Sequence, residues 1–158
     1  MTESSFTFPS DLGQLSAMRE LLDTACRSAW AVGSDDDVLR QVELALQEAA
    51  TNIIRHAYDG QPGQPIHMTV TADEHTVCVV LLHHGRGFDP DAIPPPAFDG
   101  SRFGGFGVYL IGQLVDEVQY VRDNEGRSGI RMLKRRPAPP AVDSAQSTTS
   151  PEGGPRCN

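Results

Sequence analysis

Residues 44–58 read LALQEAATNIIRHAY and place Glu48, Asn52 and His56 at intervals of four. Side chains at this spacing share one face of an α-helix, so the stretch predicts a helix with a polar row. A carboxylate one turn before an amide oxygen can set a base beside a Mg²⁺ ligand, because Mg²⁺ takes few protein oxygens and keeps its waters for phosphates. Taken alone, the same pattern also fits a solvated polar stripe on an amphipathic helix.

Two glycine-rich segments follow this helix in the chain. Residues 83–88, HHGRGF, come directly after an apolar strand, where glycines let the backbone approach a ligand closely. Residues 102–108, RFGGFGV, lead into a further helical pattern, whose unpaired N–H groups form a natural phosphate site. Arg102 adds a charge that can make a bidentate phosphate contact. Each segment alone also fits a glycine-rich turn or a flexible loop before a helix.

Hydrophobic periodicity predicts the order of the elements around these motifs. The expected strands lie near Phe6 and Phe8 and at 66–71, 76–82, 116–122 and 128–134, and the expected helices at 11–31, from about 35 to 57, and 106–115. Residues 85–105, with four prolines and five glycines, are expected to form a loop, typical of a lid or a binding loop. The order predicts an α+β fold: a two-layer α/β sandwich whose helices cover one face of a mixed, mainly antiparallel sheet.

Composition separates a folded domain at 4–136 from a tail at 137–158, which we expect to be disordered because it holds five of the twelve prolines and no aromatic side chain. The net charge of −8 argues against direct nucleic-acid binding and against docking on anionic membranes. Three widely spaced cysteines, with no CxxC pair and no signal peptide, favour a cytoplasmic protein without a zinc site. Cys78 is expected to point into the core, and Trp30 into the core or a dimer surface.

Taken together, the E-x-x-x-N, G-x-G-F and G-G-x-G motifs resemble the Bergerat ATP-binding fold of the GHKL superfamily, which includes gyrase-type, chaperone-type and histidine-kinase ATPases. The stretches LALQEAATNIIRHAY and GGFGVYLIGQLVDEVQY (residues 104–120) further resemble the stand-alone anti-sigma factor serine-protein kinases of bacterial partner-switching systems, the RsbW type. The resemblance covers about residues 6–135.

This resemblance implies ATP and Mg²⁺ as cofactors and suggests individual roles. Glu48 matches the catalytic carboxylate, which orients or deprotonates the attacking hydroxyl, and Asn52 matches the Mg²⁺ ligand. Gly85 and Gly87 match the glycines beside the adenine.

On the phosphate side, Gly105 and Gly107 match the glycines that cradle the phosphates, Arg102 lies near the arginine that reaches the terminal phosphate in some members, and residues 89–104 match the ATP lid. The full expected nucleotide-binding set comprises Asn52, His56, His83, Gly85, Gly87, Phe88, Arg102, Gly104, Gly105, Phe106, Gly107 and Val108.

The resemblance also implies partners. Members of this family phosphorylate a serine on a small antagonist protein with the STAS fold, and alternately hold a sigma factor inactive. They are commonly dimers. The expected partners are therefore a STAS-domain anti-sigma factor antagonist, a sigma factor and a second copy of the chain.

One position departs from the family pattern. The family has D-x-G-x-G-F, and its Asp accepts a hydrogen bond from the exocyclic amine of adenine, whereas this chain has His83. A neutral imidazole has one acceptor nitrogen that can take the same bond, but an imidazolium has none. Losing one buried, charge-assisted hydrogen bond costs on the order of 1.5 to 3 kcal/mol. Two hypotheses follow: an active serine-protein kinase with altered adenine recognition, or a module that sequesters a sigma factor or antagonist by contact alone.

Overall fold

The computed structural model describes residues 1–31, 36–92 and 106–138. Within them, the strands are β1 (Thr2–Pro9), β2 (Pro65–Ala72), β3 (Thr76–His83), β4 (Glu117–Arg122) and β5 (Ser128–Arg135). The α-helices are α1 (Leu15–Trp30), α2 (Asp37–Asn52) and α3 (Phe106–Leu114). Three short turns complete them: the 3₁₀ turns η1 (Leu12–Gln14) and η3 (Pro90–Ala92), and the π-helical turn η2 (Ile53–Ala57).

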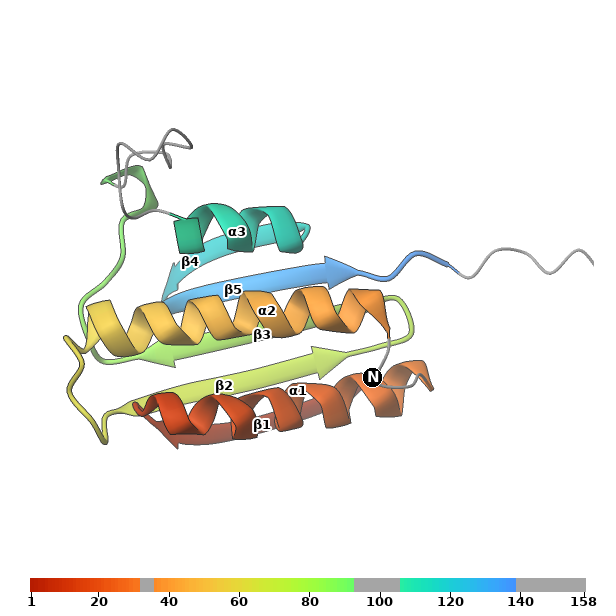
Figure 1. The fold of residues 1–158 in the computed structure, drawn as a ribbon, viewed down its shortest axis with the longest axis horizontal. Coiled ribbons are helices and arrows are strands. Elements are labelled where there is room, and N and C mark those ends of the chain that lie inside the picture. Colours follow the sequence, from red (N-terminus) through yellow and green to blue (C-terminus); the bar gives the residue numbers. More distant parts are fainter. Residues whose placement is uncertain (32–35, 93–105, 139–158) are drawn as a thin grey trace, which may run out of the picture.

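The described strands form one sheet in the order β1-β2-β3-β5-β4 (Figure 1). Every neighbouring pair is antiparallel, so the expectation of a mixed sheet is wrong for the described residues. Because β5 is antiparallel to both β3 and β4, these two strands run in the same direction without being hydrogen-bonded neighbours. The chain passes through α3 to the sheet edge at β4, and β5 then returns between β4 and β3.

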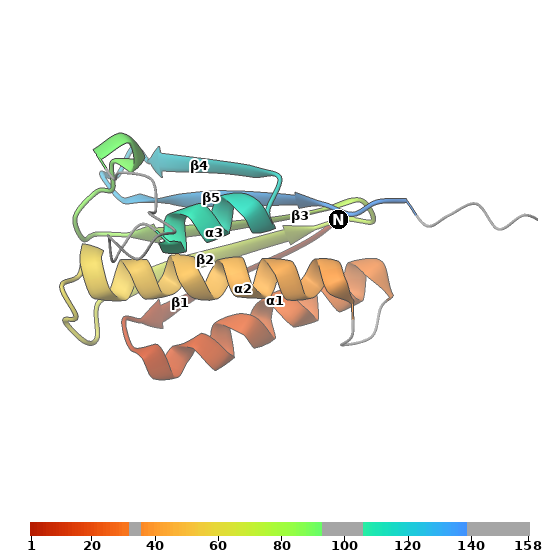
Figure 2. The same cartoon turned by 45° about the horizontal axis from the view of Figure 1, so that its top comes forward.

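The three α-helices cover one face of this sheet (Figure 2). In β2 and β3 every second side chain is buried, because successive strand residues point to opposite faces. The buried rows of these strands and the apolar faces of the helices form one core, which includes Met18, Leu22, Leu39, Val42, Leu46, Ile66, Met68, Val70, Val79, Leu81, Ile111 and Met132. The two-layer α+β sandwich is thereby confirmed.

The first helix is shorter than its expected span of 11–31. The Asp11 carboxylate accepts a hydrogen bond from the Gly13 N–H at 2.7 Å and caps the 3₁₀ turn η1, after which α1 begins at Leu15. The helix ends at Trp30, and Ala31 adopts a left-handed conformation with φ of 51°. A side-chain cap thus starts this segment, and a residue in the left-handed region ends it.

The second helix starts at a carboxylate cap and ends in a wider turn. Asp36 accepts a hydrogen bond from the Leu39 N–H at 3.0 Å, as the run of acidic residues predicts. Helical backbone continues to Ala57, but beyond Asn52 it adopts the π form, in which the Tyr58 N–H donates to the Ile53 carbonyl at 3.0 Å. Such π turns inside helices are frequent at functional sites.

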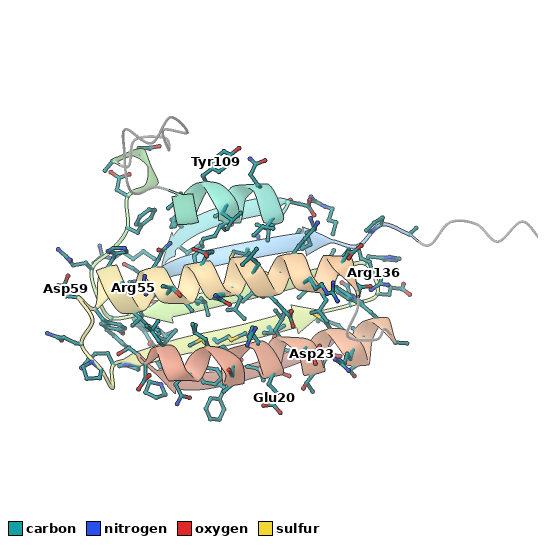
Figure 3. All side chains as sticks on the ribbon, viewed as in Figure 1. Glu20, Asp23, Arg55, Asp59, Tyr109 and Arg136 are labelled. Carbon is teal, nitrogen blue, oxygen red and sulfur yellow. The ribbon has the colours of Figure 1, made fainter. Side chains whose placement is uncertain are left out.

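The start of α2 contacts the segment after β5. Trp30 is buried, and its indole N–H donates to the Asp73 carbonyl at 2.7 Å. The guanidinium of Arg136 lies 4.9 Å from the Trp30 ring centre, and its Nη1 lies 3.0 Å from Asp36 Oδ2, although outside hydrogen-bond geometry. Figure 3 shows Arg136 at this end of α2, with Arg55 and Asp59 at the other. Of the two placements expected for Trp30, the core and a dimer surface, the structure shows the core.

The placement expected for Cys78 is wrong. The buried row of β3 contains Val77, Val79 and Leu81, so Cys78 lies on the opposite face and is half-buried there. Burial is still the main cause that raises the pKa of its thiol. The first strand begins at Thr2, before the expected domain start, and most of the expected tail, 139–158, lies outside the described residues. No helix in the described part of the chain has the length and apolar character needed to cross a bilayer.

Candidate nucleotide site

The polar row of α2 and the glycine-rich segment that contains Gly107 were predicted to act together, and they meet where α3 begins. A Cβ added to Gly107 would lie 3.1 Å from Glu48 Oε2 and 3.3 Å from Asn52 Nδ2. These distances are shorter than most Cβ contacts, so a side chain at this position would require the ends of Glu48 and Asn52 to move by a few tenths of an ångström. The backbone of that turn therefore lies beside a carboxylate and a carboxamide.

The two polar side chains are available to a ligand. Glu48 and Asn52 are half-buried, and neither side chain forms a hydrogen bond or an ion pair with another residue in the described ranges. A hard cation that takes one or two protein oxygens and keeps several waters matches such a pair, so these residues fit Mg²⁺. The same ranges contain no cluster of three or more His, Cys, Asp or Glu side chains that would hold a metal without phosphate ligands.

His56 occupies a different environment from the other two members of its row. It lies in η2 and is exposed, and its backbone carbonyl accepts a hydrogen bond from Arg86 Nη2 at 3.1 Å. Arg86 also forms an ion pair with Asp59, and both of these side chains are largely exposed. Within the described residues, the recorded role of His56 is thus to hold the loop after β3 through its backbone.

The loop after β3 packs tightly on the end of the second helix. A Cβ at Gly85 would lie 2.4 Å from the Ala57 carbonyl oxygen, and the Arg86 N–H donates to that same oxygen at 2.9 Å. The close approach expected for this glycine is present, but the group that approaches is the protein's own backbone. Gly85 therefore fixes the loop against η2.

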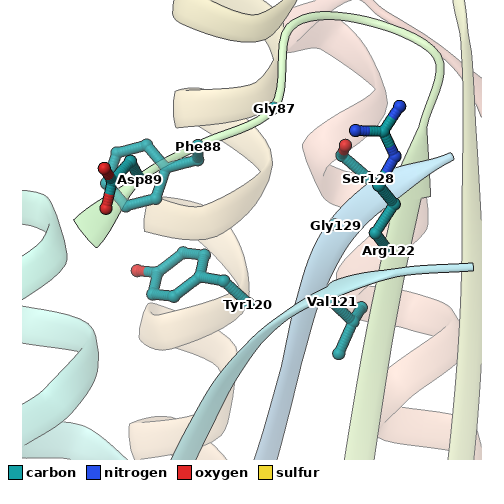
Figure 4. A pocket seen from close by; sticks show the side chains of 8 residues that line it. All are labelled: Gly87, Phe88, Asp89, Tyr120, Val121, Arg122, Ser128 and Gly129. Carbon is teal, nitrogen blue, oxygen red and sulfur yellow. The ribbon is translucent and has the colours of Figure 1, made fainter. Parts of the chain in front are cut away.

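A cleft of about 320 Å³ opens beyond this loop (Figure 4). It is lined by Gly87, Phe88, Asp89, Tyr120, Val121, Arg122, Ser128 and Gly129. The rings of Phe88 and Tyr120 are 4.7 Å apart, and a Cβ at Gly87 would lie 3.2 Å from Ser128 Oγ. The volume is at the lower end of the range for small-molecule sites.

Ser128 and Tyr120 were not predicted as site residues. Ser128 is the register partner of His83 across β3 and β5, and Tyr120 is paired with Ile130 across β4 and β5. The sequence pattern of residues 116–134 predicts two strands, but it does not indicate that the second of them pairs with β3. That pairing follows only from the order of strands in the sheet.

His83 ends the buried row of β3 and is 3% exposed. Its Nδ1 accepts a hydrogen bond from the Gly85 N–H at 3.1 Å, and its ring lies edge-on to Tyr58 at 5.7 Å. Burial, followed by the nearby His84, lowers the pKa of His83 and favours the neutral ring. The acceptor nitrogen expected to serve adenine is therefore already occupied.

The remaining predicted residues are only partly described. Val108 is half-buried in the first turn of α3, and Phe106 is its first residue. Arg102, Gly104, Gly105 and most of the expected lid lie outside the described residues.

Comparison with known proteins gives consistent matches. The sequence profile described as "Histidine kinase-like ATPase domain" matches residues 8–134. The serine-protein kinase RsbW of Halalkalibacterium halodurans is 31% identical over 103 residues, which cover 59% of this chain and 61% of that protein. The anti-sigma F factor of Anoxybacillus flavithermus is 30% identical over 106 residues, covering 62% and 70%.

A third relative comes from another organism. The serine/threonine-protein kinase BtrW of Bordetella bronchiseptica is 32% identical over 85 residues, covering 50% of this chain and 58% of that protein. The chain thus spans less than two thirds of the RsbW and BtrW relatives that it matches.

Proposed function

The chain belongs to the histidine kinase-like ATPase domain family, and from that membership we propose that it is an anti-sigma factor with serine-protein kinase activity. It binds Mg-ATP and phosphorylates a serine of a STAS-domain anti-sigma factor antagonist. The observation that carries this proposal is the approach of Gly107 to Glu48 and Asn52, which gathers a base, a metal ligand and phosphate-binding N–H groups.

The roles in phosphoryl transfer follow from these positions. The Glu48 carboxylate accepts the proton of the attacking serine hydroxyl or orients that hydroxyl for in-line attack. The carboxamide oxygen of Asn52 holds Mg²⁺, which neutralises charge on the phosphates. The N–H groups at the start of α3 donate to phosphate oxygens, and the helix dipole favours the negative charge there.

The proposed partners are inferred from the names of the related proteins. Two matched proteins are named a serine-protein kinase and an anti-sigma F factor, which supports an antagonist and a sigma factor as the proteins bound. We also propose a homodimer, because β1 is an edge strand and Phe6 and Leu12 nearby are 59% and 43% exposed. The proposed reaction takes place in the cytoplasm, where ATP and sigma factors are found.

A second candidate function is a nucleotide-independent module that sequesters its partner by contact alone. The observation that favours it is the hydrogen bond from Gly85 to His83 Nδ1, because it removes the acceptor that an adenine amine needs.

The test is phosphate transfer from labelled Mg-ATP to purified candidate antagonists. Glu48→Gln is expected to lower the rate roughly 10²- to 10⁴-fold, the usual contribution of a positioned base, while partner binding stays intact. Glu43→Gln is the matched control, because Glu43 is on the same helix but interacts electrostatically with Asp23, Arg19 and Arg27. Normal transfer by Glu48→Gln would overturn the role of that carboxylate. Partner binding without any nucleotide binding would favour the second candidate.

A further inference from the structure

A buried tyrosine lies where three elements meet at one end of the sheet. Tyr58 directly follows η2, and the end of α2, the start of β2 and the end of β3 come together at this end (Figure 1). Tyr58 is 6% exposed, and its ring lies edge-on to that of His83 at 5.7 Å. The ring is thus held in the core, where its hydroxyl group reaches the two strands.

The hydroxyl group of Tyr58 joins β2 to the residue after β3. It donates a hydrogen bond to the Pro65 carbonyl at 2.6 Å and accepts one from the His84 N–H at 2.8 Å. Burial raises the pKa of Tyr58, so the hydroxyl group keeps its proton at neutral pH and remains a donor. One side-chain oxygen therefore satisfies two backbone groups from different parts of the chain.

The next two residues of the loop after β3 pack on the same segment. A Cβ added to Gly85 would lie 3.0 Å from Cδ1 of Tyr58 and 2.4 Å from the Ala57 carbonyl oxygen. The Arg86 N–H donates to that carbonyl at 2.9 Å. The first part of the loop is therefore anchored, residue by residue, to the end of η2 and to Tyr58.

The anchored residues lead directly into the candidate nucleotide site. Gly87 and Phe88 line the cleft, and the Phe88 ring lies 4.7 Å from that of Tyr120. A Cβ added to Gly87 would lie 3.2 Å from Ser128 Oγ, which leaves little room between the loop and β5. The position of these residues in the cleft thus depends on where the loop is anchored.

We propose that Tyr58 is a positioning residue of the nucleotide site, whose hydroxyl group holds the loop after β3 in the conformation that binds nucleotide. This inference rests on the proposed nucleotide site. Tyr58 acts through the backbone of Pro65 and His84, and its role requires no contact with the nucleotide. Without the hydroxyl group, a carbonyl and an N–H beneath the loop lose their partner, and the loop has to shift to satisfy them.

The binding test uses Tyr58→Phe, which keeps the ring and removes only the hydroxyl group. Isothermal titration of the full chain with Mg-ADP is expected to show roughly tenfold weaker binding than for the native chain, the equivalent of about one hydrogen bond. Unchanged affinity overturns the inference and leaves the nucleotide site standing.

Trp30→Phe is the matched control. It also removes a hydrogen bond from a buried aromatic side chain to a backbone carbonyl, that of Asp73 at 2.7 Å. This bond lies at the other end of β2, so the variant is expected to lose stability but to bind Mg-ADP as the native chain does. An equal loss of affinity in both variants would show that Tyr58 acts only through general stability, which overturns the inference.

Kinetics separate positioning from catalysis. With labelled Mg-ATP and an antagonist as substrate, Tyr58→Phe is expected to raise KM for ATP roughly tenfold while kcat stays within about twofold, because it affects binding and not the transfer step. Glu48→Gln is expected to lower kcat instead. A lower kcat with unchanged KM in Tyr58→Phe overturns the positioning role.

Amide hydrogen exchange reports on the loop itself and needs no nucleotide. In Tyr58→Phe, the amides of His84 and Arg86 are expected to gain more exchange than those of α1, since their hydrogen bonds anchor the loop. An equal gain in both places overturns the inference. Absence of Mg-ADP binding by the native chain overturns the nucleotide site and, with it, the inference.

Discussion

At the scale of single residues, the buried imidazole of His83 makes folding sensitive to pH. Its pKa is lowered by burial, whereas in the unfolded chain it is about 6.5. As the pH falls through the unfolded value, the unfolded chain takes up a proton that the folded ring resists. The free energy of unfolding therefore decreases toward acid pH.

We expect His83→Gln to reduce this acid sensitivity, because an amide does not titrate and its oxygen can still accept from the Gly85 N–H. The measurement is urea unfolding of both proteins between about pH 8 and about pH 5.5, a window that brackets the unfolded value. The difference between the two pH profiles isolates His83 from other titrating groups such as His67, whose pKa is also lowered by burial. Identical profiles would show that the buried ring is protonated as easily as in the unfolded chain.

The same scale shows what the sequence does and does not predict about the site. The shared helix face of Glu48 and Asn52 could be predicted from sequence because their one-turn spacing is a local property of a helix. The occupied Nδ1 of His83 was not, because it depends on the fold of the loop at Gly85. Ser128 was missed because its nearness to His83 depends on strand register between segments 45 residues apart.

At the scale of elements, local sequence patterns predict where helices and strands lie better than they predict which residues or elements these contact. Helices and strands were expected within a few residues of their observed positions because periodicity is a property of short stretches. The run VCVVLL, residues 77–82, is apolar on both sides, so its pattern gives no indication of which face Cys78 occupies. The π turn η2 was not predictable because it is coupled to the packing of Gly85 on Ala57.

The third α-helix offers a direct test of element stability. Gly112 is exposed in α3, and a Cβ added there meets nothing within 4 Å. Gly112→Ala is expected to raise the free energy of unfolding by about 0.5 to 1 kcal/mol, because alanine loses less backbone entropy on entering a helix. Urea unfolding measures the change.

The control for this prediction is a glycine with no room around it. A Cβ at Gly129 in β5 would lie 1.9 Å from the Leu81 carbonyl oxygen, so Gly129→Ala is expected to destabilise the fold. A loss of stability in Gly112→Ala would contradict this prediction and show that α3 depends on the glycine at position 112.

At the scale of the whole molecule, the ion pair of Asp36 and Arg136 joins the start of α2 to the segment after β5. The two side chains are 14% and 23% exposed. Asp36→Asn keeps a capping oxygen for the Leu39 N–H but removes the charge that faces Arg136. We expect it to lower the free energy of unfolding by about 1 to 2 kcal/mol, less than for a fully buried pair because solvent screens part of the interaction.

The control variants separate charge from capping. Asp36→Ala is expected to cost about 1 kcal/mol more than Asp36→Asn, because it also removes the cap. Asp59→Asn breaks the exposed pair with Arg86 and is expected to change stability by less than about 1 kcal/mol. Equal effects of Asp36→Asn and Asp59→Asn, measured by urea unfolding, would show that the Arg136 pair contributes no more than a surface pair.

The strand order also determines when the protein becomes functional during its synthesis. The strand that carries Ser128 is inserted between β3 and β4, although it is the last strand of the described chain. While the ribosome is still adding residues before β5, the edge of β3 has no partner on that side, and unpaired strand edges are prone to aggregation. The hairpin of β4 and β5, the last one in the described chain, therefore completes the cleft lined by Tyr120 and Ser128 and protects the nascent chain at the same time.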